Sequence, residues 1–209
     1  MDTPTGADAI RAVIFDVYGV LIDLDGDLAR IEDRHALPAG ALRRAVFGIP
    51  EFAAVQAGAV TSERYFAAAA RALERLAGRP APEALAEWRS ADRPLNHEVV
   101  ELAAALRPRY TVAVLSNASA RLRAMLDERY GIAGLFDPII ASGAVGLAKP
   151  DPAIFRLAAE RIGASPECCI FIDDTAGHVA GAGAIGMRGI TYTSFTELTA
   201  ALRRLGVVW

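Results

Sequence analysis

The chain has 209 residues, of which 53% are hydrophobic and 22% charged, with a net charge of −3 at pH 7. This composition is typical of a globular protein with a buried core and excludes an intrinsically disordered chain. The slight negative charge and the lack of a basic run argue against nucleic acid as a partner. No apolar stretch is long enough to span a bilayer and no basic N-terminal region precedes an apolar one, so we predict no membrane association and a cytoplasmic location.

Five short apolar runs predict buried strands. Most are continuous rather than alternating, as expected for parallel strands covered on both faces. In chain order the predicted strands are residues 12–15, 111–115, 138–141, 168–172 and 189–193. Helical periodicity between them predicts helices at 98–106, 120–130, 152–162 and 195–205. This alternation predicts an α/β fold with a doubly wound, parallel, five-stranded sheet.

The alternation is interrupted between the first and second strands. Residues 24–94 are rich in alanine and arginine, show helical spacing and contain no strand-like run. We predict about four helices here, divided by turns at Pro38, Pro50, Pro80 and Pro82. The chain should therefore form an α/β core from residues 1–23 and 95–209, with a helical insertion at 24–94.

Polar residues follow the predicted strands. Because ligands of open α/β sheets bind at the carboxyl ends of the strands, we expect these residues to meet on one rim. Lys149 is the only lysine among 22 basic residues, which favours a need for a compact point charge at this position. The rim residues, in chain order, are Asp16, Ser116, Asn117, Lys149, Asp173 and Asp174.

The first two strand ends carry a candidate nucleophile and candidate substrate ligands. Asp16 can be held by backbone amides of the Gly19 turn and can attack phosphorus or carbon to form a covalent intermediate. A capping role in that turn is the alternative. The hydroxyl of Ser116 can donate to a substrate oxygen, with the amide of Asn117 helping to orient it, although Ser116 would also suit a helix N-cap.

The paired carboxylates Asp173 and Asp174 predict a cation. Carboxylates near Asp16 would repel one another by about 4 kcal/mol per pair at about 4 Å and an effective dielectric of about 20. A hard divalent cation offsets this repulsion, and Mg²⁺ usually binds few protein carboxylates together with water and a substrate phosphate. The ammonium of Lys149 can neutralise Asp16 and a transferring phosphoryl group.

Taken in order, the segments at 15–21, 115–117, 149–151 and 171–174 resemble the four motifs of the haloacid dehalogenase-like hydrolase superfamily. The resemblance implies a Rossmann-like core with a small helical cap. It implies a Mg²⁺-dependent phosphatase acting on a small phosphorylated metabolite through an aspartyl-phosphate on Asp16. It also implies catalytic roles for Asp16, Tyr18 and Lys149 and substrate contacts from Ser116, Asn117 and Lys149. The implied metal site consists of Asp16, Tyr18, Asp173 and Asp174: Asp16, the Tyr18 carbonyl and Asp174 bind Mg²⁺ directly, and Asp173 orients them from beside or behind.

Tyr18 departs from the usual phosphatase motif, which has a second aspartate there as general acid and base. A phenol with a reference pKa of about 10 donates a hydrogen bond but is a poor base at neutral pH. Tyr18 and the pair Ser116-Asn117 also resemble the metal-independent 2-haloacid dehalogenases, whereas the paired acids favour a phosphatase. A dehalogenase and an impaired member that only binds a phosphorylated ligand therefore stay open as alternatives.

Two further features lie after the fourth strand. His178 stands where relatives commonly carry aspartate or asparagine, and it can be a partner of the acidic site, a ligand or a plain helix residue. The glycines of residues 181–186 fit a dinucleotide-binding fingerprint by letters, but they begin seven residues after Asp174. We predict instead that they lie in a helix whose small residues permit close packing. The sequence predicts no particular oligomeric state.

Overall fold

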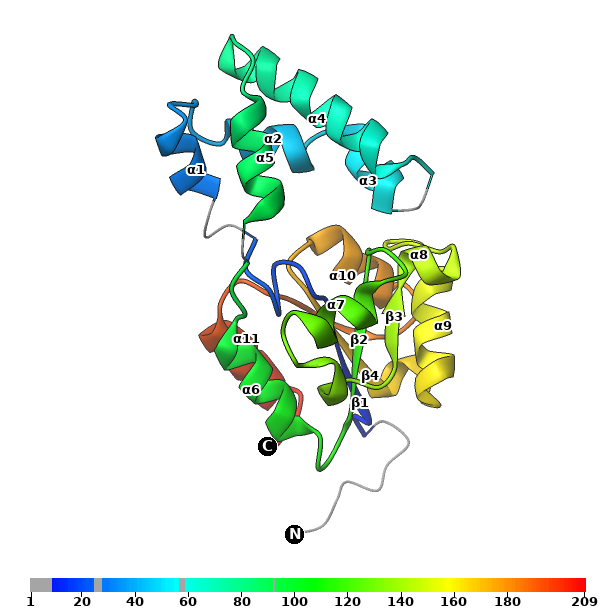
Figure 1. The fold of residues 1–209 in the computed structure, drawn as a ribbon. Coiled ribbons are helices and arrows are strands. Elements are labelled where there is room, and N and C mark those ends of the chain that lie inside the picture. Colours follow the sequence, from blue (N-terminus) through cyan, green and yellow to red (C-terminus); the bar gives the residue numbers. More distant parts are fainter. Residues whose placement is uncertain (1–8, 25–27, 57–58, 92) are drawn as a thin grey trace. The chain divides into compact units, whose positions relative to one another are not determined.

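The computed structural model describes residues 9–24, 28–56, 59–91 and 93–209 (Figure 1). The chain forms two compact units. One consists of Met1–Ile22 and Leu95–Trp209, and the other of Asp23–Pro94. Within the described ranges, no helix has the length and apolar character needed to cross a membrane.

The first unit is built around a parallel sheet of five strands in the order β3-β2-β1-β4-β5, which confirms the predicted α/β fold. The register pairs Phe15 with Val114 on one side and with Ile172 on the other, so the three central strands end at the same edge. The bounds differ from the predicted ones by no more than two residues: β1 is Ala12–Phe15, β2 Thr111–Ser116, β3 Ile139–Ala141, β4 Cys169–Asp173 and β5 Arg188–Thr191.

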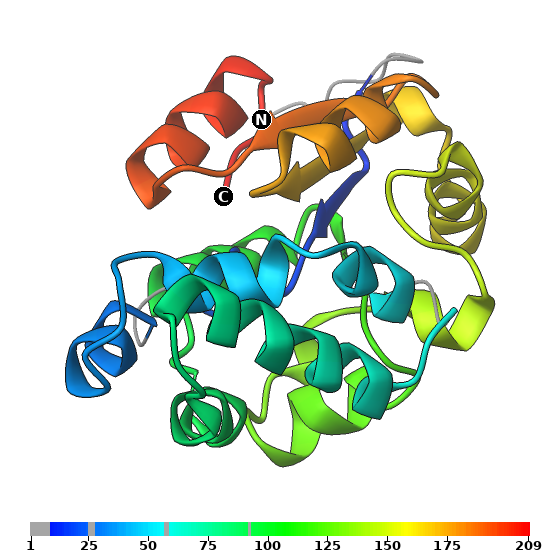
Figure 2. The same ribbon diagram turned by 90° about the horizontal axis from the view of Figure 1, so that it is seen from above.

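Both faces of this sheet are buried, which explains why the strand sequences are continuously apolar. Val13 and Phe15 face a cluster that includes α6 (His97–Leu106), α7 (Leu122–Glu128) and α11 (Phe195–Arg204). Ala12 and Ile14 face the opposite cluster, which includes α9 (Pro152–Ile162) and α10 (Ala176–Gly183). Figures 1 and 2 show α11 and α9 on opposite sides of the sheet.

Three short elements in the loops escaped sequence analysis. They are η1 (Ala133–Leu135), α8 (Ser142–Val145) and η2 (Pro166–Cys168). Each spans three or four residues, too few to show a period. The glycine-rich segment lies partly in α10, as predicted. A Cβ added at Gly181 would lie 2.5 Å from the Pro150 carbonyl oxygen, so this glycine permits the close approach of backbone.

The described part of the second unit contains five helices rather than about four. They are α1 (Leu28–Arg34), α2 (Ala41–Phe47), α3 (Pro50–Gln56), α4 (Ser62–Ala77) and α5 (Pro82–Ser90). The proline rule missed the break between α3 and α4, where no proline stands. Thr61 ends that break by accepting a hydrogen bond from the Arg64 amide at 3.3 Å, as an N-cap. Helix α2 lies along α4 (Figure 2), and the unit has its own apolar core.

Candidate active site

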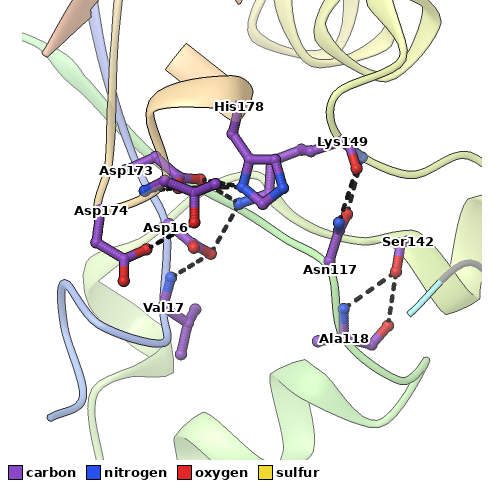
Figure 3. A network of polar contacts seen from close by, with 10 residues as sticks. Asp16, Val17, Asn117, Ala118, Ser142, Lys149, Asp173, Asp174 and His178 are labelled. Carbon is purple, nitrogen blue, oxygen red and sulfur yellow. Dashed lines mark hydrogen bonds and ion pairs between the residues drawn. The ribbon is translucent and has the colours of Figure 1, made fainter. Parts of the chain in front are cut away.

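The structure brings Asp16, Lys149 and Asp173 together at the carboxyl end of the sheet (Figure 3). Asp16 follows β1, Asp173 is the last residue of β4, and Lys149 lies in the loop after α8. The Lys149 Nζ lies 2.9 Å from Asp16 Oδ1 and 2.6 Å from Asp173 Oδ2. All three side chains are buried. A single ammonium therefore bridges two carboxylates that would otherwise repel each other.

The Asp16 carboxylate has hydrogen-bonding partners besides Lys149. Its Oδ1 also accepts a hydrogen bond from the Val17 amide at 2.7 Å, and the Ser116 side chain hydrogen-bonds to its carboxylate. Burial raises the pKa of Asp16 to about 6, opposed by the charge of Lys149 and reinforced by that of Asp173. A carboxylate that burial leaves poorly solvated is more reactive as a nucleophile than a solvated one.

Asp173 is surrounded by donors. Its Oδ1 accepts from the Thr175 amide at 2.8 Å, its Oδ2 from Lys149, and His178 Nδ1 lies 3.1 Å from both oxygens. Burial acts most strongly to raise its pKa, but the His178 hydrogen bond and the Lys149 charge together lower it to about 2. Because a carboxylate has about four acceptor positions, Asp173 suits an anchor for Lys149 better than a first ligand of a metal ion.

Asp174 stands apart from this pair, and its side chain is exposed. A Cβ added at Gly19, whose φ is +86°, would lie 2.4 Å from Asp174 Oδ2, so the carboxylate lies directly against the loop that follows β1. L side chains rarely adopt this φ, and a Cβ here would displace the Asp174 carboxylate, so the position favours glycine. Partial desolvation of the Asp174 carboxyl and the charge of Asp173 raise its pKa. Figure 3 shows Asp174 on the side of Asp16 away from Asn117.

Two places could hold a cation, and the chemistry of the donors distinguishes them. One ligand atom each of Asp16, Asp173 and His178 lies within 4.8 Å of the others. The Lys149 ammonium already lies at 2.9 and 2.6 Å from the two carboxylates there, and it would repel a second cation. The second place is the Asp174 carboxylate, which lies against Gly19 in the loop after Asp16 and, among the described residues, bears no ammonium contact. An all-oxygen set with few carboxylates fits Mg²⁺.

The two polar residues at the end of β2 have different surroundings. Ser116 is 1% exposed and bonds to Asp16. Asn117 bonds to the lysine backbone: its Nδ2 donates to the Lys149 carbonyl at 2.9 Å, and its Oδ1 accepts from the Lys149 amide at 2.8 Å. Ser116 therefore lies at the predicted nucleophile, whereas Asn117 contacts the loop that carries the predicted cation.

The Tyr18 side chain is partly buried and packs against the apolar cluster shared by β1, β2, β4, α6, α7 and α11. A short parallel bridge joins Tyr18 to Ile22. Sequence reasoning missed Ser142, which is 1% exposed and whose Oγ contacts the Ala118 amide at 3.0 Å and the Ala118 carbonyl at 3.2 Å. A polar residue directly after the apolar third strand was the available signal.

The polar residues thus gather at the carboxyl edge of an open parallel sheet, where α/β proteins bind their ligands. The chain belongs to the haloacid dehalogenase-like hydrolase family, whose sequence profile matches residues 10–186. The predicted family is thereby confirmed.

Similar proteins include enzymes of several kinds. The chain is 28% identical to bifunctional epoxide hydrolase 2 of Sus scrofa, over 91% of the chain and 38% of that protein. It is 40% identical to phosphatase MT3486 of Mycobacterium tuberculosis, over 37% of the chain and 36% of that protein. Each alignment thus spans less than two fifths of the relative.

Solved structures confirm the fold. A dehalogenase matches with a TM-score of 0.73 and 20% identity, over 93% of this chain and 98% of that one. An Asp-to-Ala variant of a haloacid dehalogenase-like enzyme from Bacteroides thetaiotaomicron, in complex with magnesium and inorganic phosphate, matches with a TM-score of 0.63 and 19% identity, over 88% of this chain and 95% of that one. At these identities the likeness concerns the fold.

Proposed function

We propose that this protein is a Mg²⁺-dependent phosphatase that hydrolyses a small phosphorylated metabolite through an aspartyl-phosphate on Asp16. The observation that carries the proposal is the exposed Asp174 carboxylate against Gly19. Lys149 provides one positive charge for Asp16 and Asp173, and Asp174 adds a third carboxylate. A substrate anion would meet excess negative charge at this rim, and a bound divalent cation removes that penalty. The magnesium- and phosphate-bound Bacteroides enzyme and the mycobacterial phosphatase support the proposal.

The side chains divide the work as follows. A carboxylate oxygen of Asp16 attacks phosphorus and expels the leaving group as an alkoxide, which takes up a proton from solvent and departs as the alcohol. Water then attacks the phosphorus of the aspartyl-phosphate, breaks its bond to the Asp16 oxygen and returns one proton to solvent, which releases phosphate and regenerates the carboxylate. Lys149 stabilises the negative charge on the transferring group, and Asp173 with His178 holds Lys149 in place. Ser116 orients Asp16 and can donate to a phosphoryl oxygen. Mg²⁺ held by Asp16, the Tyr18 carbonyl and Asp174 would shield the phosphoryl oxygens.

A 2-haloacid dehalogenase is the second candidate. Tyr18 in the first motif and the likeness in fold to a solved dehalogenase favour it. The buried bridge of Asp16, Lys149 and Asp173 would serve that reaction without a metal. Asp174 argues against it, because an unneutralised carboxylate beside the nucleophile repels the carboxylate of a haloacid.

An activity assay separates the candidates. With an aryl phosphate and Mg²⁺ we expect phosphate release that is abolished by EDTA and reduced at least about 10³-fold in Asp16→Asn, which lacks the nucleophile. Release of chloride from 2-chloropropionate in EDTA would instead identify a dehalogenase. Binding of Mg²⁺ and phosphate without either activity would identify an impaired member of the family.

A further inference from the structure

The amide of Asn117 forms a reciprocal pair with the backbone of Lys149, the only lysine in the chain. Its Nδ2 donates to the Lys149 carbonyl at 2.9 Å and its Oδ1 accepts from the Lys149 amide at 2.8 Å. Asn117 is 7% and Lys149 4% exposed, so water does not substitute easily for either bond. The pair joins the end of β2 to a loop 32 residues further along the chain.

These two hydrogen bonds fix the backbone position of Lys149, and with it the Cα atom that carries the side chain. Among the described residues, the Lys149 amide and carbonyl take part in no other backbone hydrogen bond. A buried backbone group without a hydrogen bond costs free energy. The conformation in which Asn117 bonds to both the Lys149 amide and the Lys149 carbonyl is therefore favoured. From that point the ammonium reaches Asp16 at 2.9 Å and Asp173 at 2.6 Å. A shift of about 1 Å in such a group is enough to cost about 10²-fold in rate.

The loop that follows Asn117 is held by a different residue, Ser142. Ser142 Oγ bonds to both the amide and the carbonyl of Ala118, the residue after Asn117. A Cβ added at Gly143 would lie 3.0 Å from the Ala118 carbonyl oxygen, so this segment packs tightly against the loop. Ser142 thus bonds to the loop after β2 at Ala118, one residue beyond the amide that holds Lys149. It offers a control in which buried hydrogen bonds are lost from the same loop.

We propose that Asn117 is a positioning residue: its amide holds the Lys149 backbone so that the ammonium lies between Asp16 and Asp173, instead of binding the substrate. The residue type supports this, because only a carboxamide presents a donor and an acceptor side by side. An aspartate of the same shape keeps the acceptor for the Lys149 amide but faces the carbonyl with a second acceptor. The inference rests on the proposed function only for its kinetic readout.

The single lysine provides a direct probe. Protein labelled with ¹³C,¹⁵N-lysine gives one Nζ signal and one Cε signal, so the lysine ammonium signal needs no assignment to a residue. In the substrate-free protein we expect this signal to move or broaden in Asn117→Ala and in Asn117→Asp, and to keep its wild-type position in Ser142→Ala. Should Asn117→Ala fail to fold, Asn117→Asp carries the test. A lysine signal unchanged in the folded Asn117 variants would overturn the proposal.

Kinetics with an aryl phosphate and Mg²⁺ provide the second readout. We expect Asn117→Ala to lower kcat about 10- to 100-fold, the usual effect of losing a supporting side chain, with KM within about threefold of wild type. Ser142→Ala should keep kcat within about threefold. A raised KM with unchanged kcat would show that Asn117 binds substrate and would overturn the proposal. A moved lysine signal in a protein without phosphatase activity would reject the proposed function and keep the positioning role.

Discussion

Lys149 is buried between two buried carboxylates, and this makes its removal costly. Replacing Lys149 with methionine keeps much of the side-chain volume but leaves Asp16 and Asp173 without their ammonium. We expect Lys149→Met to lower the free energy of unfolding at pH 7 by about 3–5 kcal/mol, the usual cost of breaking a buried ion pair from one side. Urea unfolding followed by fluorescence measures this loss.

The matched control is Arg121→Met, which removes a cation from an exposed ion pair. Arg121 lies 3.9 Å from Glu128, and its side chain is 81% exposed. Such pairs contribute little, so the unfolding free energy should change by less than about 0.5 kcal/mol. Equal losses in the two variants would show that burial of the Lys149 bridge does not matter.

The contacts within the site differ in how far the sequence could predict them. Asp16, Lys149 and Asp173 were predicted to meet because parallel strands end at one edge of the sheet, and that geometry depends on the order of elements alone. The partner of Asn117 was not predictable, because it depends on where a loop 32 residues away settles. His178 is intermediate: five residues separate it from Asp173, across the turn into α10.

At the scale of elements, α2 is capped from a distance. Its N-cap residue, Gly40, has no side chain to accept from the first amides of the helix. The buried carboxylate of Glu32, at the end of α1, accepts from the Gly40 and Leu42 amides, both at 2.7 Å. We expect Glu32→Ala to lower the free energy of unfolding by about 2–4 kcal/mol, because two amides lose a charged acceptor.

The buried Trp88 lies in this unit, and urea unfolding followed by tryptophan fluorescence measures the loss. The neighbouring Asp33 is exposed on the same helix, and Asp33→Ala should change the stability by less than about 0.5 kcal/mol. A Glu32→Ala protein as stable as Asp33→Ala would show that water caps α2 as well as Glu32 does.

The helical insertion shows why elements were harder to predict than strands. Alanine-rich helical spacing and prolines predict about four helices in 24–94, whereas the described residues of this segment form five, because Thr61 rather than a proline marks the start of α4. The cap of α2 lies eight to ten residues upstream, outside any local capping pattern. The prediction of the core strands needed apolar runs alone. Those runs are continuous because the sheet is buried on both faces.

At the scale of the whole molecule, the site makes folding stability depend on pH. Burial raises the pKa of Asp16 to about 6, above the value of 3.8 for an unperturbed carboxyl. The folded protein therefore binds this proton more tightly than the unfolded chain does. The stability contributed by Asp16 is complete below about pH 4 and is lost as pH rises through about 6, by an amount on the order of 3 kcal/mol. The low pKa of Asp173, about 2, places its own titration below this range.

The measurement is the difference in unfolding free energy between wild type and Asp16→Asn in EDTA, from pH 4 to pH 7.5. We expect wild type to lose stability relative to Asp16→Asn across this range, whereas the exposed Asp127→Asn should follow wild type. A difference that stays constant with pH would mean that Asp16 titrates normally.

Because a metal ion binds the ionised carboxylate and competes with the proton, Mg²⁺ should raise the melting temperature of wild type at pH 7 and have little effect below pH 5. The carboxylate that burial makes unfavourable is then the one that a cation stabilises, which links the stability of the free enzyme to the reaction proposed for it.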